Sequence, residues 1–264
     1  MKVWLFAKKE NSRACMLARK IASLAIERGL RVAVHPSLAG TTGGEPVPPR
    51  MVGGWADVMI VVGGDGTFIR CFHEVPEPPP ILGVNIGGVG FLMEVLPKDV
   101  EKALSELEEG GWRIEKRSCG LLKTEGREVR FINEVVVTSP HHNTLIGFQL
   151  VLDGESVELG RADGFIVATP TGSTAYALSA GGPILDAGLE ALEFIPLAPF
   201  NALLRPLVVS SGRKIVLKTS RTARVVVDGY LTLSTEGELS FEVIPGALQT
   251  IKLSVSEPLS RRLR

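Results

Sequence analysis

The chain has 264 residues, 45% apolar and 22% charged, which is the balance of a globular protein large enough for a sizeable core. Lysine plus arginine and aspartate plus glutamate each number 29, so no whole-protein charge favours nucleic acid or a membrane surface as a partner. Three scattered cysteines without a CxxC pair argue against a disulfide scaffold or a zinc site and favour a reducing cytoplasm. The sequence contains no run of about 18 apolar residues, the length expected of a transmembrane helix.

The first part of the chain has the pattern of an open α/β sheet of Rossmann type. Its first apolar run is broken by charge and is too short for a signal peptide, so we interpret it as a strand. Ser37–Arg50 is rich in Gly, Pro and Thr and predicts a flexible loop. The expected elements are strand Lys2–Ala7, helix Asn11–Arg28 with a cap at Asn11 or Ser12, and strands Leu30–His35, Asp57–Val62 and Ile81–Asn85.

A short amphipathic helix, Lys98–Glu109, precedes a long region of strand-like runs. We therefore expect a Rossmann-like domain over residues 1–96 and a β-rich domain over residues 97–264, whose extreme C-terminus has the option of packing back on the first. One helix, Ser173–Ala180, interrupts the runs, and Asp153-Gly154 predicts a hairpin turn. The strand-like runs are Val129–Thr138, Ile146–Leu152, Phe165–Thr169, Pro206–Val209, Lys214–Thr219, Ala223–Val227, Leu239–Ile244 and Ile251–Val255.

A glycine-rich loop, Gly63–Thr67, follows the apolar strand that ends at Val62. Glycines let the backbone approach a ligand, and their N–H groups at the start of a helix bind phosphate oxygens. The carboxyl end of a strand is also where α/β sheets bind ligands. Because an acid in such a loop repels phosphate, Asp65 is expected to accept a hydroxyl proton or hold a metal. The alternative is a plain strand-to-helix turn that Asp65 caps.

Two further loops carry glycine or hydroxyl residues. Gly83–Leu92 also follows an apolar strand, and its Phe91 either stacks on a flat ring or lies in the core. In Arg161–Pro183, small hydroxyl residues surround a predicted turn between a strand and a helix, where Ser173 or Thr174 would cap the helix. The N-terminus of that helix would be a second anion-binding place, and the hydroxyls would suit the oxygens of a dinucleotide. A capped helix in a tight corner is the alternative.

Several motifs are absent. The sequence has no GxxxxGK[ST] loop, and Lys8-Lys9-Glu10 stands where a GxGxxG would follow the first strand, which disfavours Walker-type hydrolysis and ordinary hydride transfer. HExxH and GxSxG are also missing. We interpret His141-His142 as a loop detail, because adjacent strand residues point opposite ways. Asp228-Gly229, followed by Tyr230, is typical of a hairpin turn.

Together these motifs resemble those of the NAD kinases. Gly63–Thr67 is similar to the GGDGT motif of that family, which diacylglycerol and sphingosine kinases share in similar form. Gly83–Leu92 resembles its GxNxGxxGFL segment, and Asn133-Glu134 resembles its Asn-Glu pair. Asp163–Pro183 resembles the long DG…TPTGSTAY…SAGGP signature, which separates NAD kinases from the lipid kinases. Tyr230 departs from the family, in which Gln or His often follows Asp-Gly.

The resemblance implies transfer of a phosphoryl group from ATP or another donor, such as polyphosphate, to the adenosine 2′-hydroxyl of NAD. Asp65 matches the catalytic base, and Gly64 and Gly66 contribute backbone beside it. Asn133 and Glu134 match the pair that holds the ribose hydroxyls and the adenosine of NAD. Other matched positions line the NAD site or wrap the dinucleotide. They are Arg161, Asp163, Thr174, Ala175, Tyr176, Ala177, Leu178 and Ser179, with Phe91, Arg70, Thr171, Ala198 and Tyr230 at or near other ligand contacts.

The resemblance also implies a divalent metal, usually Mg²⁺, for which the sequence names no protein ligand, and a homodimer or homotetramer in the cytoplasm. Two other functions stay open. A lipid kinase would use the same loop on a lipid hydroxyl, although no basic amphipathic segment favours a membrane. A non-catalytic dinucleotide sensor would need no acid at Asp65.

Overall fold

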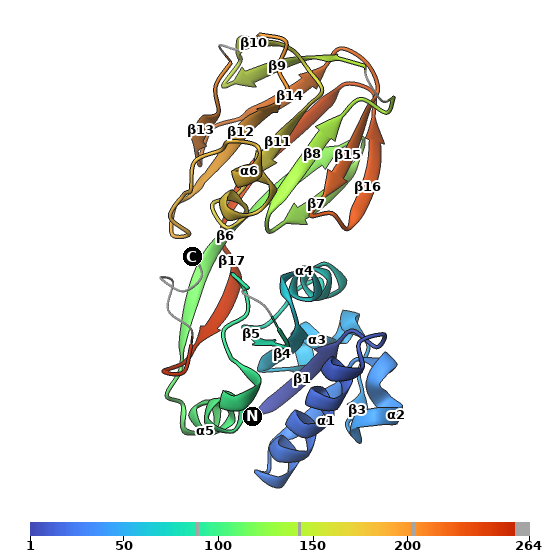
Figure 1. Cartoon of the computed structure of the whole chain (residues 1–264), viewed down its shortest axis with the longest axis vertical. Helices are drawn as coiled ribbons and strands as arrows, with labels where there is room; N and C mark the ends of the chain where they lie inside the picture. The colour runs from blue at the N-terminus through green and yellow to red at the C-terminus, as the bar shows by residue number, and fades with distance from the viewer. Residues whose placement is uncertain (88–89, 142–143, 202–203, 257–264) are drawn as a thin grey trace. The chain divides into compact units, whose positions relative to one another are not determined.

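The computed structural model describes residues 1–87, 90–141, 144–201 and 204–256 and confirms an α/β unit and a β-rich unit (Figure 1). The first compact unit is Met1–Glu115 together with the described residues from Gln249 onward, and the second is Lys116–Leu248; the extreme C-terminus, residues 257–264, lies outside the described residues. The boundary expected near residue 96 lies before this division, because helix α5 (Val100–Glu109) packs its apolar side into the core of the first unit. Across the described ranges, every helix falls short of the length and apolar character that crossing a membrane requires.

The first unit is built on a parallel sheet whose strands β1, β4 and β5 are almost wholly buried, as their apolar runs in the sequence predict. Thr250, near the end of β17 (Glu238–Lys252), adds a parallel bridge to Ile81 at one edge. The other strands, in spatial order, are β5 (Ile81–Asn85), β4 (Val58–Gly63), β1 (Lys2–Ala7), β2 (Arg31–Val34) and β3 (Glu45–Pro46).

Helix α1 (Ser12–Glu27) and helix α5 share one apolar core with these strands. The side chain of Asn11 accepts a hydrogen bond from the N–H of Ala14 at 3.1 Å, which confirms the cap predicted from the sequence. The helix ends before Gly29, which has a φ of +77°. The start and the end of this helix were therefore predictable from local residue chemistry alone.

The expectation of a flexible loop over Ser37–Arg50 is wrong. This stretch holds short ordered elements, and the indole N–H of Trp4 donates to the carbonyl of Val47 at 3.0 Å. Leu38 is fully buried. Composition predicted a loop because each piece is too short to show a period. The pieces here and just after it are η1 (Pro36–Leu38), α2 (Ala39–Thr42), β3, η2 (Pro49–Met51) and α3 (Val52–Trp55).

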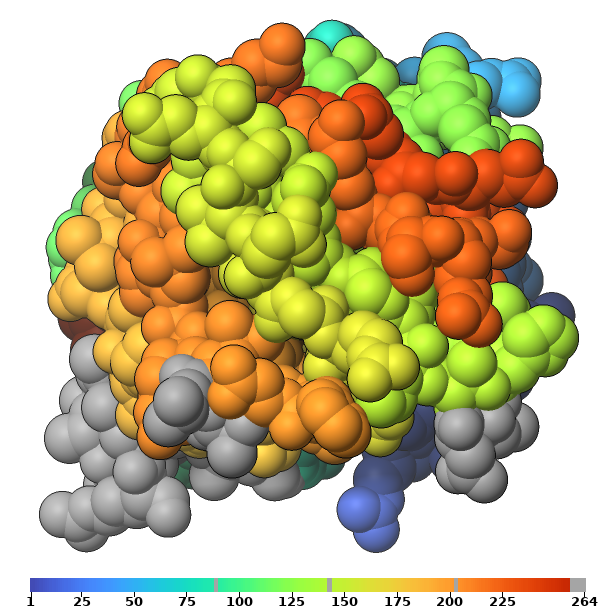
Figure 2. Space-filling view, turned by 90° about the horizontal axis from the view of Figure 1, so that it is seen from above, coloured from blue at the N-terminus to red at the C-terminus, as the bar shows by residue number. Residues whose placement is uncertain are grey.

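The second unit contains two groups of antiparallel strands that enclose one apolar core. The yellow-green β9–β10 hairpin crosses one face of the molecule, with orange residues from later in the chain beside it (Figure 2). One sheet has the order β13 (Leu207–Ser210), β12 (Ala191–Leu197), β11 (Gly164–Ala168), β8 (Glu134–Thr138), β15 (Ala223–Val227) and β16 (Leu231–Thr235). The other group runs β10 (Glu155–Ala162), β9 (Ile146–Leu152), β14 (Ile215–Thr219) and β17, with β6 (Arg113–Thr124) pairing β7 (Arg127–Phe131).

Several strand predictions need correction. The run Val129–Thr138 is two strands, because the chain bends at Ile132 and Asn133 between β7 and β8. The predicted run Leu239–Ile244 and the first two residues of the run Ile251–Val255 belong to one long strand, β17, which ends at Lys252. Strands β6, β10, β12 and β16 were not predicted: charged residues interrupt β6 and β10, β12 is a buried apolar run that contains a glutamate, and β16 has only five residues. The Asp153-Gly154 turn is confirmed, with φ of 54° and 91°.

Candidate functional site

The glycine loop joins β4 to helix α4 (Asp65–Glu74), which begins after Gly64. A Cβ on Gly63 would lie 2.4 Å from the hydroxyl oxygen of Thr67, so close packing alone requires that glycine. A Cβ on Gly64 or Gly66 would meet nothing within 4 Å. These two glycines therefore leave their backbone open to a ligand, and their N–H groups lie at the positive end of a helix.

The carboxylate of Asp65 is fixed by the second glycine-rich loop. One oxygen accepts the N–H of Phe91 at 2.8 Å, and the other accepts the N–H of Leu92 at 3.0 Å. A Cβ on Gly90 would lie 2.9 Å from Oδ1 of Asp65, so the close approach of this loop to the carboxylate depends on glycine. Gly64 rather than Asp65 occupies the N-cap position, and it provides no side-chain cap. Within the same loop, Gly88 and Val89 lie outside the described residues.

An open pocket of about 340 Å³ lies over this loop, lined by Lys8, Gly64, Gly66, Thr67 and Arg70. Arg70 also pairs with Glu74, at 2.7 Å between its Nε and a carboxylate oxygen. Lys8 was not among the predicted site residues. Its position could have been inferred, because Ala7 pairs with Val62 and so both strands end at one edge of the sheet. The pocket thus combines backbone N–H groups with two cationic side chains, the chemistry that phosphate binding requires.

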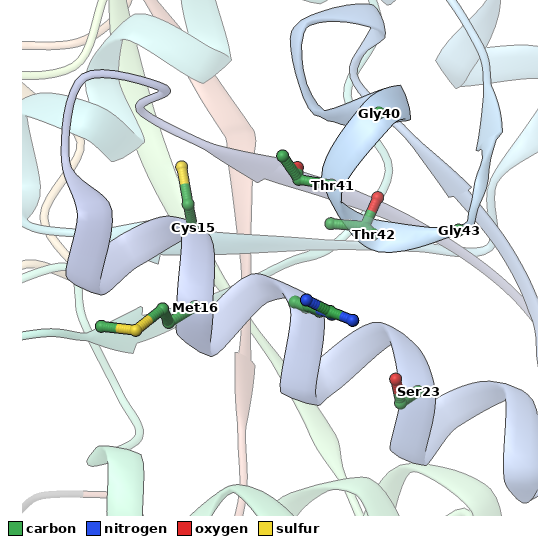
Figure 3. A pocket seen from close by; sticks show the side chains of 8 residues that line it. Cys15, Met16, Ser23, Gly40, Thr41, Thr42 and Gly43 are labelled. Atoms are coloured by element: carbon green, nitrogen blue, oxygen red, sulfur yellow. The ribbon is translucent and has the colours of Figure 1, made fainter.

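A larger hollow, of about 540 Å³, lies elsewhere in the first unit. Figure 3 shows Cys15 and Ser23 on α1 and Thr41 and Thr42 on the short α2 segment beside it. The hydroxyls of both threonines donate to the carbonyl of Leu38, at 2.9 and 3.0 Å. None of the predicted site residues lines this hollow, and we assign it no role in the reaction.

In the second unit, Asp228 organises the Asn133-Glu134 pair. Its carboxylate accepts the backbone N–H groups of Ile132 at 2.8 Å, Asn133 at 2.8 Å and Glu134 at 3.0 Å. The hairpin turn predicted at Asp228-Gly229 is confirmed, with φ of 50° and 62°. The hydrogen bonds of Asp228 to these N–H groups could not be predicted from sequence, because the three donors stand more than 90 residues earlier in the chain.

Glu134 is buried beside this cluster, with 8% of its surface exposed. Its carboxyl group accepts the backbone N–H of Tyr176, while Oε2 is buried without a hydrogen-bond partner. Burial, together with the negative charge of Asp228, raises the pKa of Glu134 to about 7. Such an unpartnered acceptor is costly unless a donor reaches it, so this position suits a ligand hydroxyl.

The hydroxyl-rich segment after β11 packs against Asn133. The N–H of Thr169 donates to the carbonyl of Asn133 at 2.9 Å. A Cβ on Gly172 would lie 2.1 Å from that same carbonyl oxygen, so only glycine fits there. Thr171 is buried, and its hydroxyl has no hydrogen-bond partner. Close contact with the backbone of Asn133 therefore explains why glycine stands at position 172 of this segment.

The predicted helix Ser173–Ala180 is wrong in length and in its cap. A 3₁₀ turn, η4 (Gly172–Thr174), is followed by α6 (Tyr176–Ser179), and neither has a side-chain cap. Ser173 instead bonds the carbonyl of Pro170 at 2.7 Å and the N–H of Leu185 at 3.0 Å. A helix of four residues has little macrodipole, which removes the basis for a second anion site at its start. Tyr176 and Leu178 are largely exposed, at 47% and 43%, whereas Ala177 is buried.

The remaining predicted residues divide between two places. Tyr230 follows the Asp228 turn and is 49% exposed. Arg161, Asp163 and Ala198 lie near Gly164 at the other end of β11, four residues or about 13 Å along the strand from Ala168. There, the guanidinium of Arg161 lies over the ring of Phe200 at 5.1 Å. The structure thus groups Asn133, Glu134 and Thr171–Ser179, and it does not bring the Arg161 set to them. Of the adjacent histidines, His142 lies outside the described residues.

The glycine–aspartate loop at the end of a parallel strand has the features of a phosphate-binding site, in a chain made of one α/β unit and one β-rich unit. Two family models match the chain, the ATP-NAD kinase N-terminal domain over residues 3–112 and the ATP-NAD kinase C-terminal domain over residues 132–253. An NAD kinase of Methanothermobacter thermautotrophicus is 36% identical over 87% of this chain and 83% of its own. An NAD kinase of Methanoregula boonei is 32% identical over 100% of this chain and 99% of its own. The chain belongs to the ATP-NAD kinase family.

Solved structures agree with this membership. A crystal structure of an NAD kinase from Archaeoglobus fulgidus in complex with ATP has a TM-score of 0.78 and 30% identity, covering 97% of this chain and 94% of that one. A yeast NADH kinase structure has a TM-score of 0.82 and covers 96% and 82%, and at 23% identity it is evidence for the fold alone.

Proposed function

We propose that this chain phosphorylates the adenosine 2′-hydroxyl of NAD to give NADP. Family membership supports the reaction. The main structural support is the carboxylate of Asp65, which accepts hydrogen bonds from two backbone N–H groups. The glycines on either side of Asp65 have free space around their backbone, where a ligand could approach. ATP is the first donor we propose, because the related Archaeoglobus fulgidus enzyme was solved with ATP. Another nucleotide or polyphosphate is the alternative donor.

The proposed step is an in-line displacement at the γ-phosphorus of the donor. The 2′-oxygen of NAD forms the new bond to phosphorus, the bond from phosphorus to the bridging oxygen breaks, and ADP leaves. Asp65 takes the hydroxyl proton. Each of its oxygens accepts one N–H, so each keeps acceptor capacity for this task. Lys8, Arg70 and the N–H groups of Gly64 and Gly66 would stabilise phosphate charge.

Asn133 and Glu134 are proposed to hold the ribose hydroxyls and the adenosine of NAD. The unpartnered Oε2 of Glu134 supports this role, since a ribose hydroxyl would supply its missing donor. Thr174–Ser179 is proposed to wrap the dinucleotide, with Thr171 and Tyr230 nearby. Arg161, Asp163 and Ala198 stay predicted contacts of the ligand, as does Phe91.

A divalent metal, Mg²⁺ by resemblance, fits this site only in part. In the described portion of the chain, no three histidine, cysteine, aspartate or glutamate side chains gather to hold an ion. Mg²⁺ commonly needs just one or two carboxylates besides substrate phosphates and water. We therefore propose that the metal is held mainly by the donor phosphates, whose charge it would neutralise. A homo-oligomer in the cytoplasm stays a prediction.

An acceptor panel tests this function. The purified protein is incubated with ATP and Mg²⁺ and with NAD, NADH, diacylglycerol or sphingosine, and phosphorylated products are quantified. We expect NADP to form and the lipids to remain unphosphorylated. Phosphorylated lipid without NADP would favour the lipid kinase, and NAD binding without product under ATP, other nucleotides and polyphosphate would favour a dinucleotide sensor.

A further inference from the structure

Glu193 is a buried acid that the proposed reaction does not use. It lies on β12, between β13 and β11 in the six-stranded sheet, with 0% of its surface exposed. Both of its carboxyl oxygens are buried, and neither has a hydrogen-bond partner. Leaving two polar atoms unsatisfied is costly in a protein interior, so the group calls for an explanation.

The strand register places Glu193 on the same face of the sheet as Glu134. Ala168 of β11 pairs with Glu134 of β8 on one side and with Glu193 of β12 on the other. Directly paired residues point to the same face of a sheet, so the two glutamates flank Ala168. Ile166, Ala168 and Ile195 on that face pack against Ala177 of α6, which Figure 1 draws in front of β11 and β12.

The two glutamates therefore lie under the two ends of one short segment. At its start, the N–H of Tyr176 bonds to Glu134. At its end, a Cβ on Gly182 would lie 3.2 Å from Oε2 of Glu193 and 3.0 Å from the carbonyl oxygen of Ala177. The N–H of Gly182 donates to that carbonyl at 3.0 Å and closes the turn over Glu193.

Among the residues that the structure describes, no charged group pairs with Glu193. Its neighbours across the strands, Ala168 and Val208, are apolar. Nearby along the chain, Glu190 and Asp186 are exposed and bond to Ser211 and Gly188. The covering turn from Tyr176 to Gly182 contributes Tyr176 as its only titratable group, and the other glutamate on the face lies beyond Ala168. Burial alone raises the pKa of Glu193, to about 7.

We propose that Glu193 is a positioning residue for NAD binding: as an uncharged acid it lets the turn from Ala177 to Gly182 close on the sheet, and its ionisation loosens that turn. An ionised carboxylate without a donor must recruit water, and the turn excludes water until it lifts. Lifting the turn moves Tyr176 and Ser179 with it. The proposal rests on the proposed function in one respect, that this segment binds NAD.

The direction of the pH dependence follows from the raised pKa. In the open turn the acid would regain its ordinary pKa of 4.5, whereas in the closed turn it has a pKa of about 7. Its stabilisation of the closed turn is therefore complete below pH 4.5 and is lost as the pH rises to about 7. Opening grows about tenfold per pH unit in that window and then levels off.

The test compares the wild type with Glu193→Gln, which keeps the shape and cannot ionise. Hydrogen exchange is followed in the ligand-free protein at pH 5 and pH 8 for the amides of Ala180, Gly181 and Gly182, with β9 amides as the internal reference. We expect the wild-type to variant ratio of exchange rates to rise at least about tenfold between the two pH values. Glu190→Gln, an exposed control, should behave as the wild type. Glu193→Met is the second variant if glutamine impairs folding.

The dissociation constant of NAD is measured on the same proteins at pH 8, where Glu193→Gln should bind more tightly than the wild type. Equal exchange ratios at both pH values would overturn the role of Glu193 and leave the proposed function intact. If exchange changes and NAD affinity does not, Glu193 controls the turn, and the assignment of this turn to NAD is what fails.

Discussion

Asp65 and Glu134 are two carboxylates in very different surroundings. Asp65 is partly exposed, and backbone N–H groups hold both of its oxygens. Glu134 is buried and keeps one oxygen without a partner. The first arrangement fixes an acceptor beside an open pocket, which suits removal of a proton. The second leaves an acceptor that only an incoming donor satisfies, which suits recognition of a hydroxyl.

Replacing Glu134 by alanine should therefore raise the KM for NAD more than the KM for ATP. The lost hydrogen bond to a buried group is worth about 1–3 kcal/mol, or roughly 5- to 150-fold in affinity. Steady-state kinetics with each substrate varied in turn measure the two constants. Glu155→Ala, an exposed acid at the β9–β10 hairpin, is the matched control. If only the KM for ATP rose, Glu134 would contact the donor, and its assignment to NAD would be wrong.

The sequence made some of these residues predictable and hid others. Asp65 stands out because an acid is out of place among glycines that bind phosphate. Asp228 does not, because an Asp-Gly pair is sufficient for a turn, and its bonds to Ile132–Glu134 depend on the fold. Glu193 is hidden in an apolar run, and only strand pairing brings it beside Ala168.

At the scale of elements, Asp65 joins the two glycine-rich loops of the first unit. Both loops follow neighbouring strands, since β4 pairs with β5 along its whole length. Continuous apolar runs predicted both strands, and the position of a ligand at their carboxyl ends was expected from that. The bonds from Phe91 and Leu92 to Asp65 could not be predicted, because they span more than 25 residues of chain.

Gly90→Ala tests this connection. The new Cβ would lie 2.9 Å from Oδ1 of Asp65 and 3.0 Å from the side chain of Met93, so the carboxylate must shift. A displacement near 1 Å costs up to about 10²-fold in turnover. We expect kcat to fall while the circular dichroism spectrum is unchanged. Gly87→Ala in the same loop meets nothing within 4 Å and should retain activity. Equal activity of both variants would contradict the connection.

The hydroxyl-rich segment shows the limit of local patterns. Small polar residues after β11 predicted a capped helix, but Gly172 and Ser173 are used to pack on Asn133 and to bond Pro170 and Leu185. Tertiary contacts thus shorten the helix to four residues. Ser173 resembles a helix cap in the sequence, but its hydroxyl instead bonds to the N–H of Leu185, twelve residues later in the chain.

At the scale of the whole molecule, the chain leaves the first unit after Glu115 and returns to it at Gln249. The returning strand carries Lys252, which pairs with the buried Glu94 and lies 3.2 Å from Glu115. Glu94 follows the segment that holds Asp65, and its side chain is only 1% exposed. This ion pair therefore ties the end of β17 to the loop that supports the proposed catalytic base.

Lys252→Met should destabilise the protein by about 1.5–3 kcal/mol, the usual contribution of a hydrogen bond to a charged group, because it removes the ammonium group that pairs with the buried carboxylate of Glu94. Urea unfolding measures the loss. Because the double variant Lys252→Met/Glu94→Gln loses the same pair only once, its loss of stability should be smaller than the sum of the losses of the two single variants. If the single variant were as stable as the wild type, the pair would have no structural role.

The most direct test of the account measures NADP formation by the wild type and by Asp65→Asn with saturating NAD, ATP and Mg²⁺. Phosphorus NMR identifies the position of the new phosphate, and circular dichroism confirms that the variant is folded. We predict 2′-phosphorylated product from the wild type and turnover at least about 10²-fold lower in the variant. No NADP from the wild type with any donor, or near-normal turnover by a folded Asp65→Asn variant, would contradict the account.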